Sequence, residues 1–245
     1  MSRSKRAASK RSAKQQRRRE ALETQVVNPT PISAVKHSPP ELHAQTETQG
    51  LYISTILHSD ISFGIGPAGT GKTYVSAALA CEALLSGEIS QIVLTRPAVD
   101  VESFGALPGE LEDKYAPYLE PFMYVFKQYF SKGQLEYMIK AKKIVGEPLA
   151  FMRGKTYDNA WILFDEAQNA TIPQVKMVIT RLGKNSKLII SGDNSQKDLP
   201  RHVESGLKDA VIRLSDMPEI GVTEFVKSDC VRHGLLSRIL ERYGE

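Results

Sequence analysis

The feature that most constrains the fold is a glycine-rich loop between an apolar segment and a segment rich in Ala and Leu. Residues 66–73 read Gly-Pro-Ala-Gly-Thr-Gly-Lys-Thr and fit the pattern G-x-x-x-x-G-K-[ST]. The apolar run Ile61–Ile65 predicts a strand before the loop, and residues 74–85 predict a helix after it. This order aims backbone N–H groups and a helix N-terminus at a bound anion. The sequence therefore predicts a phosphate-binding loop.

Each loop position has a physical reason. Three glycines let the backbone curl without Cβ clashes. Lys72 is expected to reach the β- and γ-phosphates, and the Thr73 hydroxyl to bind Mg²⁺. A chance match in a chain of this length is of order one per cent, so the loop predicts ATP and Mg²⁺ as cofactors. The predicted nucleotide-binding residues of the loop are Gly66, Pro67, Ala68, Gly69, Thr70, Gly71, Lys72 and Thr73.

Apolar runs recur along the chain and alternate with segments of helical pattern. The runs are continuous rather than alternating with polar residues, which is typical of parallel strands covered on both faces. The sequence thus predicts an α/β fold of the RecA-like type. Further strands are expected at 91–95, 144–147, 160–164, 187–191 and 221–225, with helices at 173–182, 203–214 and 231–243 and two or three more within 99–140.

Two carboxylates follow the apolar strand predicted at 160–164. Asp165 and Glu166 should lie at its carboxyl end, the edge of a parallel sheet that faces the ligand crevice. Asp165 is expected to hold Mg²⁺ through its water shell, and Glu166 to polarise the attacking water. A kinase must exclude hydrolytic water, so this pair argues against a small-molecule kinase.

Three more polar residues are candidates for the site. Gln196 could bridge the γ-phosphate and the attacking water, or it could belong to an ordinary turn with an Asn cap. Arg96 could touch nucleic-acid backbone or the nucleotide, or it could be a surface residue paired to an acid. Arg232, before the last predicted helix, is the candidate arginine finger. Whether it acts in its own subunit or in a neighbour is open.

The charge of the chain is unevenly distributed. Residues 1–20 hold nine Lys and Arg against one acidic residue, whereas the net charge of the whole chain is +4. Residues 1–45 also contain several prolines and no apolar period, so we predict a disordered basic arm before an ATPase domain at 46–245. The arm could contact nucleic acid through its phosphates, or it could be a solvated tail, since it lacks aromatics for stacking.

Composition also bears on the compartment. The first residues lack the apolar stretch of a secretory signal, and no apolar run approaches a membrane span, so no membrane partner is expected. A transit peptide is the nearer alternative for the Arg- and Ser-rich start. Two distant cysteines, Cys81 and Cys230, predict neither a disulfide framework nor a metal site, which favours the cytoplasm. We expect Cys81 and the aromatic residues of 115–130 to lie in the core.

The motif set resembles the PhoH family, a group of single-domain relatives of superfamily 1 helicases. The likeness runs from about Gln49 to the C-terminus. It is carried by Phe63–Thr73, Leu94–Val99, Gly105–Gly109, Tyr115–Pro121, Phe151–Gly154, Asp165–Asn169, Ser191–Asp193 with Gln196, and Asp198–Arg201.

The resemblance implies a RecA-like fold, ATP hydrolysis and a role in RNA or single-strand handling, and some members form rings. It also implies that Gln49, just before the first predicted strand, reads adenine. After the pair that corresponds to Arg232-His233, the family usually has Pro, whereas this chain has Gly234.

Two functions follow as expectations. The first is an ATPase that couples hydrolysis to remodelling of RNA or single-stranded DNA. One RecA-like domain alone cannot close on another across ATP, so this reading predicts a homo-oligomer, such as a ring, with ATP at the subunit interface. The second is a nucleotide-gated switch or oligomeric scaffold without a nucleic-acid substrate.

Overall fold

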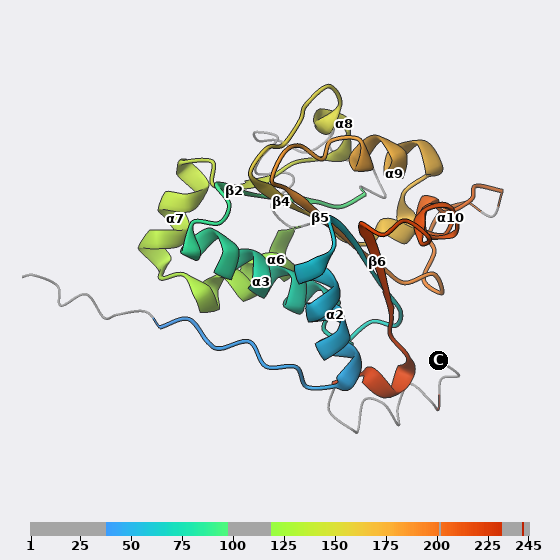
Figure 1. The fold of residues 1–245 in the computed structure, drawn as a ribbon, viewed down its shortest axis with the longest axis horizontal. Helices are drawn as coiled ribbons and strands as arrows, with labels where there is room; N and C mark the ends of the chain where they lie inside the picture. Colours follow the sequence, from blue (N-terminus) through green and yellow to red (C-terminus); the bar gives the residue numbers. More distant parts are fainter. Residues whose placement is uncertain (1–37, 98–118, 201, 232–241, 243–245) are drawn as a thin grey trace, which may run out of the picture. The chain divides into compact units, whose positions relative to one another are not determined.

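Six parallel strands form the centre of the fold, in the order β3-β2-β4-β5-β1-β6 (Figure 1). The computed structural model describes residues 38–97, 119–200, 202–231 and 242, which belong to one compact unit from Ser38 to Glu245. The strands are β1 (Ile61–Ile65), β2 (Gln91–Thr95), β3 (Ile144–Gly146), β4 (Ala160–Phe164), β5 (Lys187–Gly192) and β6 (Ile220–Glu224).

Helices cover both faces of the sheet (Figure 1). Two separate apolar cores result, one on each face. The first core receives side chains from α2 (Glu47–His58), α3 (Lys72–Ser86), α6 (Glu120–Tyr129) and α7 (Lys132–Lys140). The second receives side chains from α8 (Leu149–Met152), α9 (Ile172–Ile179) and α10 (Gly206–Leu214).

The strands supply both cores because successive side chains point to opposite faces. In β4, Trp161 and Leu163 join the first core, whereas Ile162 and Phe164 join the second. All five residues of β4 are buried, and burying one such large side chain contributes about 1.5–3 kcal/mol. The predicted parallel sheet covered on both faces is confirmed.

The helix after the phosphate-binding loop starts earlier than its apolar pattern indicates. α3 begins at Lys72 rather than at residue 74, because Gly71 adopts a left-handed conformation with φ of 87° and ends the loop there. Gly87, with φ of 79°, ends the helix in the same conformation, which favours glycine. Lys72 and Thr73 are thus held by a helix rather than by a loop.

The helix α2 was not predicted. Thr46 caps it, and Tyr52 and Ile56 are fully buried against the first core. Leu51 and Leu57 are exposed on the same helix, so its apolar residues mark no single face.

Several expectations fall outside the described residues. The predicted disordered arm at 1–45 lies mostly there, as do part of the segment 99–140 and most of the predicted last helix at 231–243. In the part of the chain that the structure describes, Cys81, Phe122, Phe126, Tyr129 and Phe130 are buried as expected. Tyr124 is 65% exposed and is the exception. No helix among the described residues is both long and apolar enough to cross a membrane.

Candidate nucleotide site

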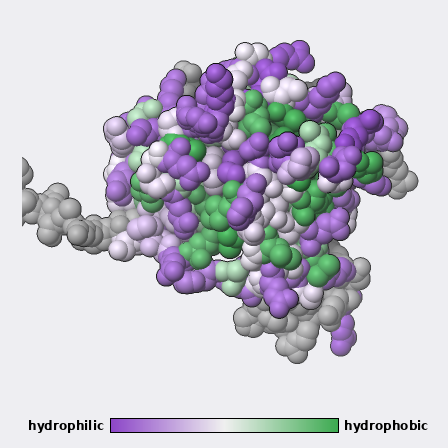
Figure 2. All heavy atoms as spheres, viewed as in Figure 1, coloured by the Kyte–Doolittle hydropathy of each residue, from purple (hydrophilic) through white to green (hydrophobic). Residues whose placement is uncertain are grey.

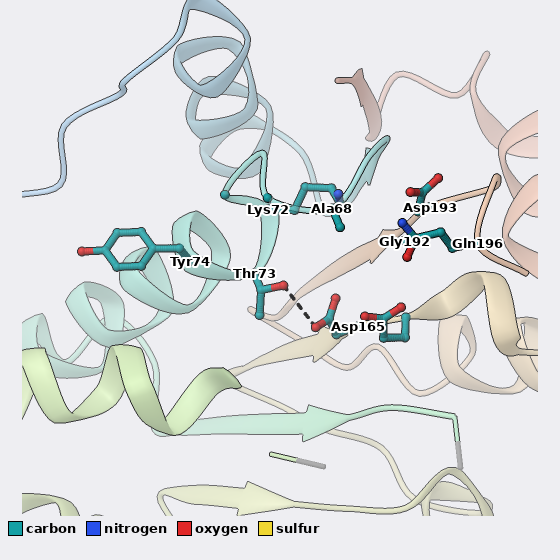
Figure 3. Close-up of a pocket in the computed structure, with 11 residues that line it drawn as sticks. Ala68, Lys72, Thr73, Tyr74, Asp165, Gly192, Asp193 and Gln196 are labelled. Atoms are coloured by element: carbon teal, nitrogen blue, oxygen red, sulfur yellow. Dashed lines mark hydrogen bonds between the residues drawn. The ribbon is translucent and has the colours of Figure 1, made fainter. Parts of the chain in front are cut away.

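The predicted phosphate loop and the polar ends of β4 and β5 meet around one cavity of about 240 Å³ (Figure 3). The cavity lies at the carboxyl edge of the sheet, because each contributing segment follows a parallel strand. It is lined by Ala68, Gly69, Gly71, Lys72, Thr73, Tyr74, Asp165, Glu166, Gly192, Asp193 and Gln196.

The loop packs tightly against the rest of the site through its glycines. At Gly66, φ is 140°, and a Cβ would lie 2.3 Å from the carbonyl oxygen of Phe225. The Gly66 N–H donates to the Gly192 carbonyl at 3.1 Å, which ties the loop to the end of β5. A side chain at Gly66 would therefore displace the loop from β5 or β6.

Lys72 is held inside the loop. Its Nζ donates to the carbonyl oxygens of Gly66 at 2.6 Å and Pro67 at 2.7 Å, and to the Thr70 hydroxyl at 3.3 Å. Burial lowers the pKa of Lys72, and the Asp165 carboxylate is the largest of the influences that oppose this shift. The ammonium group thus lies ready at the cavity, with weak carbonyl partners that a phosphate can replace.

Thr73 and Asp165 are adjacent, as a shared Mg²⁺ would require. The Thr73 hydroxyl donates to Asp165 Oδ2 at 3.1 Å (Figure 3), and the Ser191 hydroxyl donates to Asp165 Oδ1 at 2.8 Å. Asp165 is only 5% exposed. Burial raises its pKa, and the nearby Arg96 guanidinium opposes this effect most strongly.

Glu166 directly follows Asp165 and has an uncommon backbone conformation. Its φ of 54° and ψ of 35° are left-handed, which turns the chain sharply after β4. Its Oε1 accepts from Arg96 Nη2 at 2.9 Å, and its Oε2 accepts from Gln168 Nε2 at 2.6 Å. Arg96 also lies 4.0 Å from Asp165. Arg96 is therefore paired with an acid, as one predicted alternative had it, but inside the site rather than on the surface. Its contact with a nucleotide or a nucleic acid stays a prediction.

Gln49 contacts the phosphate loop, although α2 places it in the helix before β1 rather than immediately before the strand. Its side-chain Nε2 donates to the Thr70 carbonyl at 3.0 Å, and its Oε1 accepts from the Gln45 N–H at 2.8 Å. It is 4% exposed. A Cβ on Gly71 would lie 2.7 Å from Gln49 Nε2, so the two residues pack directly together.

The turn after β5 places Gln196 at the cavity. Asp193 Oδ1 accepts from the Ser195 N–H and hydroxyl at 2.9 and 2.6 Å, so Asp193 rather than an asparagine stabilises this turn. Asp193 Oδ2 is buried and has no hydrogen-bond partner among the residues that the structure describes. A buried carboxylate oxygen without such a partner is costly, so this end of the cavity favours a cation or a hydrogen-bond donor.

Arg232, the predicted arginine finger, lies outside the described residues. The residue before it is close to the loop: the Val231 N–H donates to the Gly69 carbonyl at 3.2 Å. The Cys230 thiol also lies 3.8 Å from the Ala68 carbonyl oxygen.

Sequence reasoning missed three residues of the site. Asp193 and Gln168 carried no assigned role, although both follow apolar strands closely. Tyr74 lines the cavity, but in Figure 3 its ring points away from the carboxylates, and its hydroxyl donates to Gln128 at 3.1 Å.

The donor set fits magnesium bound together with a nucleotide. Within the described residues, no group of three His, Cys, Asp or Glu side chains could hold a metal ion. One hydroxyl and one carboxylate, Thr73 and Asp165, suit Mg²⁺, which keeps waters and takes its other oxygens from phosphates. Lys72 and the loop N–H groups would bind those phosphates.

The fold and the loop define this chain as a P-loop NTPase. A family model described as PhoH-like protein matches residues 41–244. The chain is 44% identical over 203 residues to a PhoH-like protein of Synechocystis and 45% identical over 203 residues to one of Bacillus subtilis. It is 41% identical over 203 residues to Protein PhoH of Escherichia coli. The chain therefore belongs to the PhoH family.

The matches cover 82% of this chain but only 62%, 64% and 57% of those three relatives. The chain thus spans less than two thirds of their length. Among solved structures, a Sulfolobus solfataricus SWI2/SNF2 ATPase core in complex with dsDNA matches at 15% identity and a TM-score of 0.37, over 64% of this chain and 34% of that one. The Pyrococcus furiosus Hef helicase domain matches at 15% identity and 0.42, over 72% and 37%.

Proposed function

We propose that this protein binds ATP with Mg²⁺ and hydrolyses it, and that it couples hydrolysis to remodelling of RNA or single-stranded DNA. The observation that carries the ATPase is the grouping of Lys72, Thr73, Asp165 and Glu166 around one cavity. Thr73 and Asp165 would hold the metal, and Lys72 the β- and γ-phosphates. Glu166 lies beside these two metal-binding residues, where it can polarise the attacking water.

The test of the ATPase is steady-state hydrolysis in Mg²⁺ by the wild type and Glu166→Gln. We expect the variant to lose about 10²–10⁴-fold in turnover, the range for a positioned general base, while it still binds ATP. Glu120→Gln is the matched control, because Glu120 is exposed on α6 and does not line the cavity. Equal turnover in Glu166→Gln and the wild type would remove Glu166 from the reaction.

The nucleic-acid part of the proposal has different support. The first twenty residues carry nine basic residues against one acidic residue, and Arg96 lies beside Glu166 at the ligand edge of the sheet. The same hydrolysis assay with single-stranded RNA and single-stranded DNA tests this part. Faster turnover with either strand supports coupling. Unchanged turnover with both would contradict coupling, and only the proposed ATP hydrolysis would remain.

A second function is favoured by one feature of the site. Both carboxylate oxygens of Glu166 are already occupied, by Arg96 and by Gln168. A base so engaged fits slow hydrolysis, as in a nucleotide-gated switch or oligomeric scaffold. Hydrolysis that ignores nucleic acid but depends on protein concentration would favour this function.

Both functions include a homo-oligomer, which we propose to be a ring with ATP at the subunit interface. The face shown in Figure 2 carries apolar patches between hydrophilic side chains. On α2, Leu51 is 64% exposed and Leu57 is 50% exposed, and Val226 after β6 is 56% exposed. Sedimentation velocity with and without ATP tests the assembly, and a monomer in both conditions would exclude it.

We propose the cytoplasm as the compartment, since both cysteines are free.

A further inference from the structure

Gln168 makes contacts that no role assigned so far explains. It lies in the short 3₁₀ helix η2 (Ala167–Asn169), directly after Glu166, and is 1% exposed. Its Oε1 accepts from the Asp193 N–H at 3.0 Å. Its Nε2 donates to Glu166 Oε2 at 2.6 Å and to the Gln196 carbonyl at 3.3 Å. Both donors and the acceptor of the amide are therefore used.

These contacts join the two halves of the cavity. Glu166 belongs to the segment after β4, whereas Asp193 and Gln196 belong to the turn after β5. The packing leaves little freedom at this junction, because a Cβ on Gly192 would lie 2.6 Å from Gln168 Oε1. Because the Asp193 N–H donates to Gln168 Oε1, a displacement of the β5 turn would also displace the Gln168 amide.

The strongest of the three bonds ends on Glu166. Hydrogen bonds to ionised groups are shorter and stronger than neutral ones, and the bond to Glu166 is the shortest that Gln168 makes. The other two partners of Gln168 are backbone groups, the Asp193 N–H and the Gln196 carbonyl. Gln168 therefore ties this turn to one oxygen of a carboxylate that lines the cavity.

We propose that Gln168 is a positioning residue that couples the β5 turn to Glu166. A γ-phosphate contacting Gln196 would shift this turn, and Gln168 would pass the shift to the Glu166 carboxylate. As a result, the Glu166 carboxylate would be aligned with the attacking water only while the triphosphate is intact. This inference rests on the proposed ATPase function and adds the residue that links nucleotide sensing to the base.

Neighbouring residues provide a matched control. Asn169 also joins η2 to the chain after β5: its Nδ2 donates to Asp198 Oδ2 at 3.3 Å, and its Oδ1 accepts from the Asp198 N–H at 2.8 Å. This second link is exposed, and neither of its two side-chain bonds reaches the Glu166 carboxylate. Removing it tests the fastening of the two turns without touching the base.

The experiment compares Gln168→Glu, Gln168→Met and Asn169→Ala with the wild type. Gln168→Glu keeps the acceptor for the Asp193 N–H but loses the donor to Glu166, and Gln168→Met removes the polar contacts without adding charge. We expect kcat to fall by about 10–100-fold in both Gln168 variants, from the strength of hydrogen bonds to charged groups. ATP affinity, measured by calorimetry, should change by less than about threefold, and Asn169→Ala should keep nearly full kcat.

A double variant separates positioning from structure. Exchanging the two side chains, in Gln168→Glu with Glu166→Gln, restores an amide donor opposite a carboxylate, so the thermal midpoint should return toward the wild-type value. If Gln168 acts through Glu166, Gln168→Glu should cause no further loss of kcat in the Glu166→Gln background.

Three outcomes overturn the inference. They are unchanged kcat in both folded Gln168 variants, an equal loss in Asn169→Ala, or additive losses in the double variant. If one of these outcomes is found while the wild type hydrolyses ATP and Glu166→Gln has lost turnover, the inference falls but the proposed ATPase function stands. A wild type without ATP hydrolysis would overturn the proposed function itself.

Discussion

Lys72 shows how a single side chain is placed for a ligand. Its Nζ has three acceptors in the loop, and only 9% of the residue is exposed. Two of these acceptors are carbonyl oxygens, which bind an ammonium group less strongly than a phosphate does. A bound nucleotide would therefore meet an ammonium group that is already buried and close to the cavity.

We expect Lys72→Met to weaken ATP binding by about 10–100-fold, the range for a charge-assisted hydrogen bond. Titration with a fluorescent nucleotide measures the change. Lys187→Met is a matched control, because Lys187 is also partly buried and also donates to two carbonyls, those of Leu57 and Ser59. It precedes the buried part of β5, at the opposite edge of the sheet. An equal loss of affinity in Lys187→Met would mean that folding, not phosphate binding, was measured.

Two glycines in the same conformation separate local strain from function. Gly71 and Gly87 both have φ near 80°, where Ala costs about 1–2 kcal/mol. A Cβ at Gly71 meets Gln49, whereas a Cβ at Gly87 has no atom within 4 Å. We expect both Ala variants to lower the free energy of unfolding, but only Gly71→Ala to weaken ATP binding. Urea denaturation and nucleotide titration measure the two effects, and intact affinity in Gly71→Ala would contradict the packing argument.

At the scale of elements, α2 connects its own N-cap to the phosphate loop. Thr46 Oγ1 accepts from the Gln49 N–H at 3.1 Å, and the Gln49 side chain reaches the Thr70 carbonyl. The capping of this helix and the position of Gln49 thus depend on each other.

We expect Thr46→Ala to cost about 1 kcal/mol of stability, as for other N-caps, and to weaken ATP binding several-fold through Gln49. Ser131→Ala removes a similar N-cap bond from α7, where Ser131 Oγ accepts from the Gln134 N–H, and α7 does not line the cavity. It should cost about the same stability and leave ATP affinity unchanged. Thermal melts measure the stability of the two variants, and calorimetry measures their affinity for ATP. Equal ATP affinities in Thr46→Ala and Ser131→Ala would mean that Gln49 does not contribute to nucleotide binding.

The sequence predicts elements well where one local rule decides. Strand β4 and its two carboxylates follow from a continuous apolar run and its polar end. Helix α2 could not be found this way, because Leu51 and Leu57 are apolar but exposed. Gln168 was also beyond reach, since its partners are brought together only when β4 pairs with β5.

At the scale of the whole molecule, the basic residues are unevenly distributed along the sequence. The residues that line the cavity lie between positions 68 and 196, beyond the first twenty residues. Nine basic residues among the first twenty can release counterions from a nucleic acid.

We expect a chain without residues 1–37 to hydrolyse ATP as the wild type does in the absence of nucleic acid. Its affinity for single strands should fall, and its binding should depend less steeply on salt. Fluorescence anisotropy at several salt concentrations measures this. A full-length chain with the basic residues of 1–20 changed to Gln is the control for length, and should behave like the truncated chain. An unchanged salt dependence would assign the arm to solubility.

The position of β1 has a consequence for how the protein is made. The strand that carries the phosphate loop pairs with β5 on one side and β6 on the other, and both are synthesised after β4. Such distant pairings form late, because the intervening chain must first be ordered. A growing chain on the ribosome therefore exposes its loop before β5 and β6 exist, and the sheet around the loop is complete only after residue 224 has been synthesised. Occupancy by nucleotide would then report that β5 and β6 have joined the sheet beside β1.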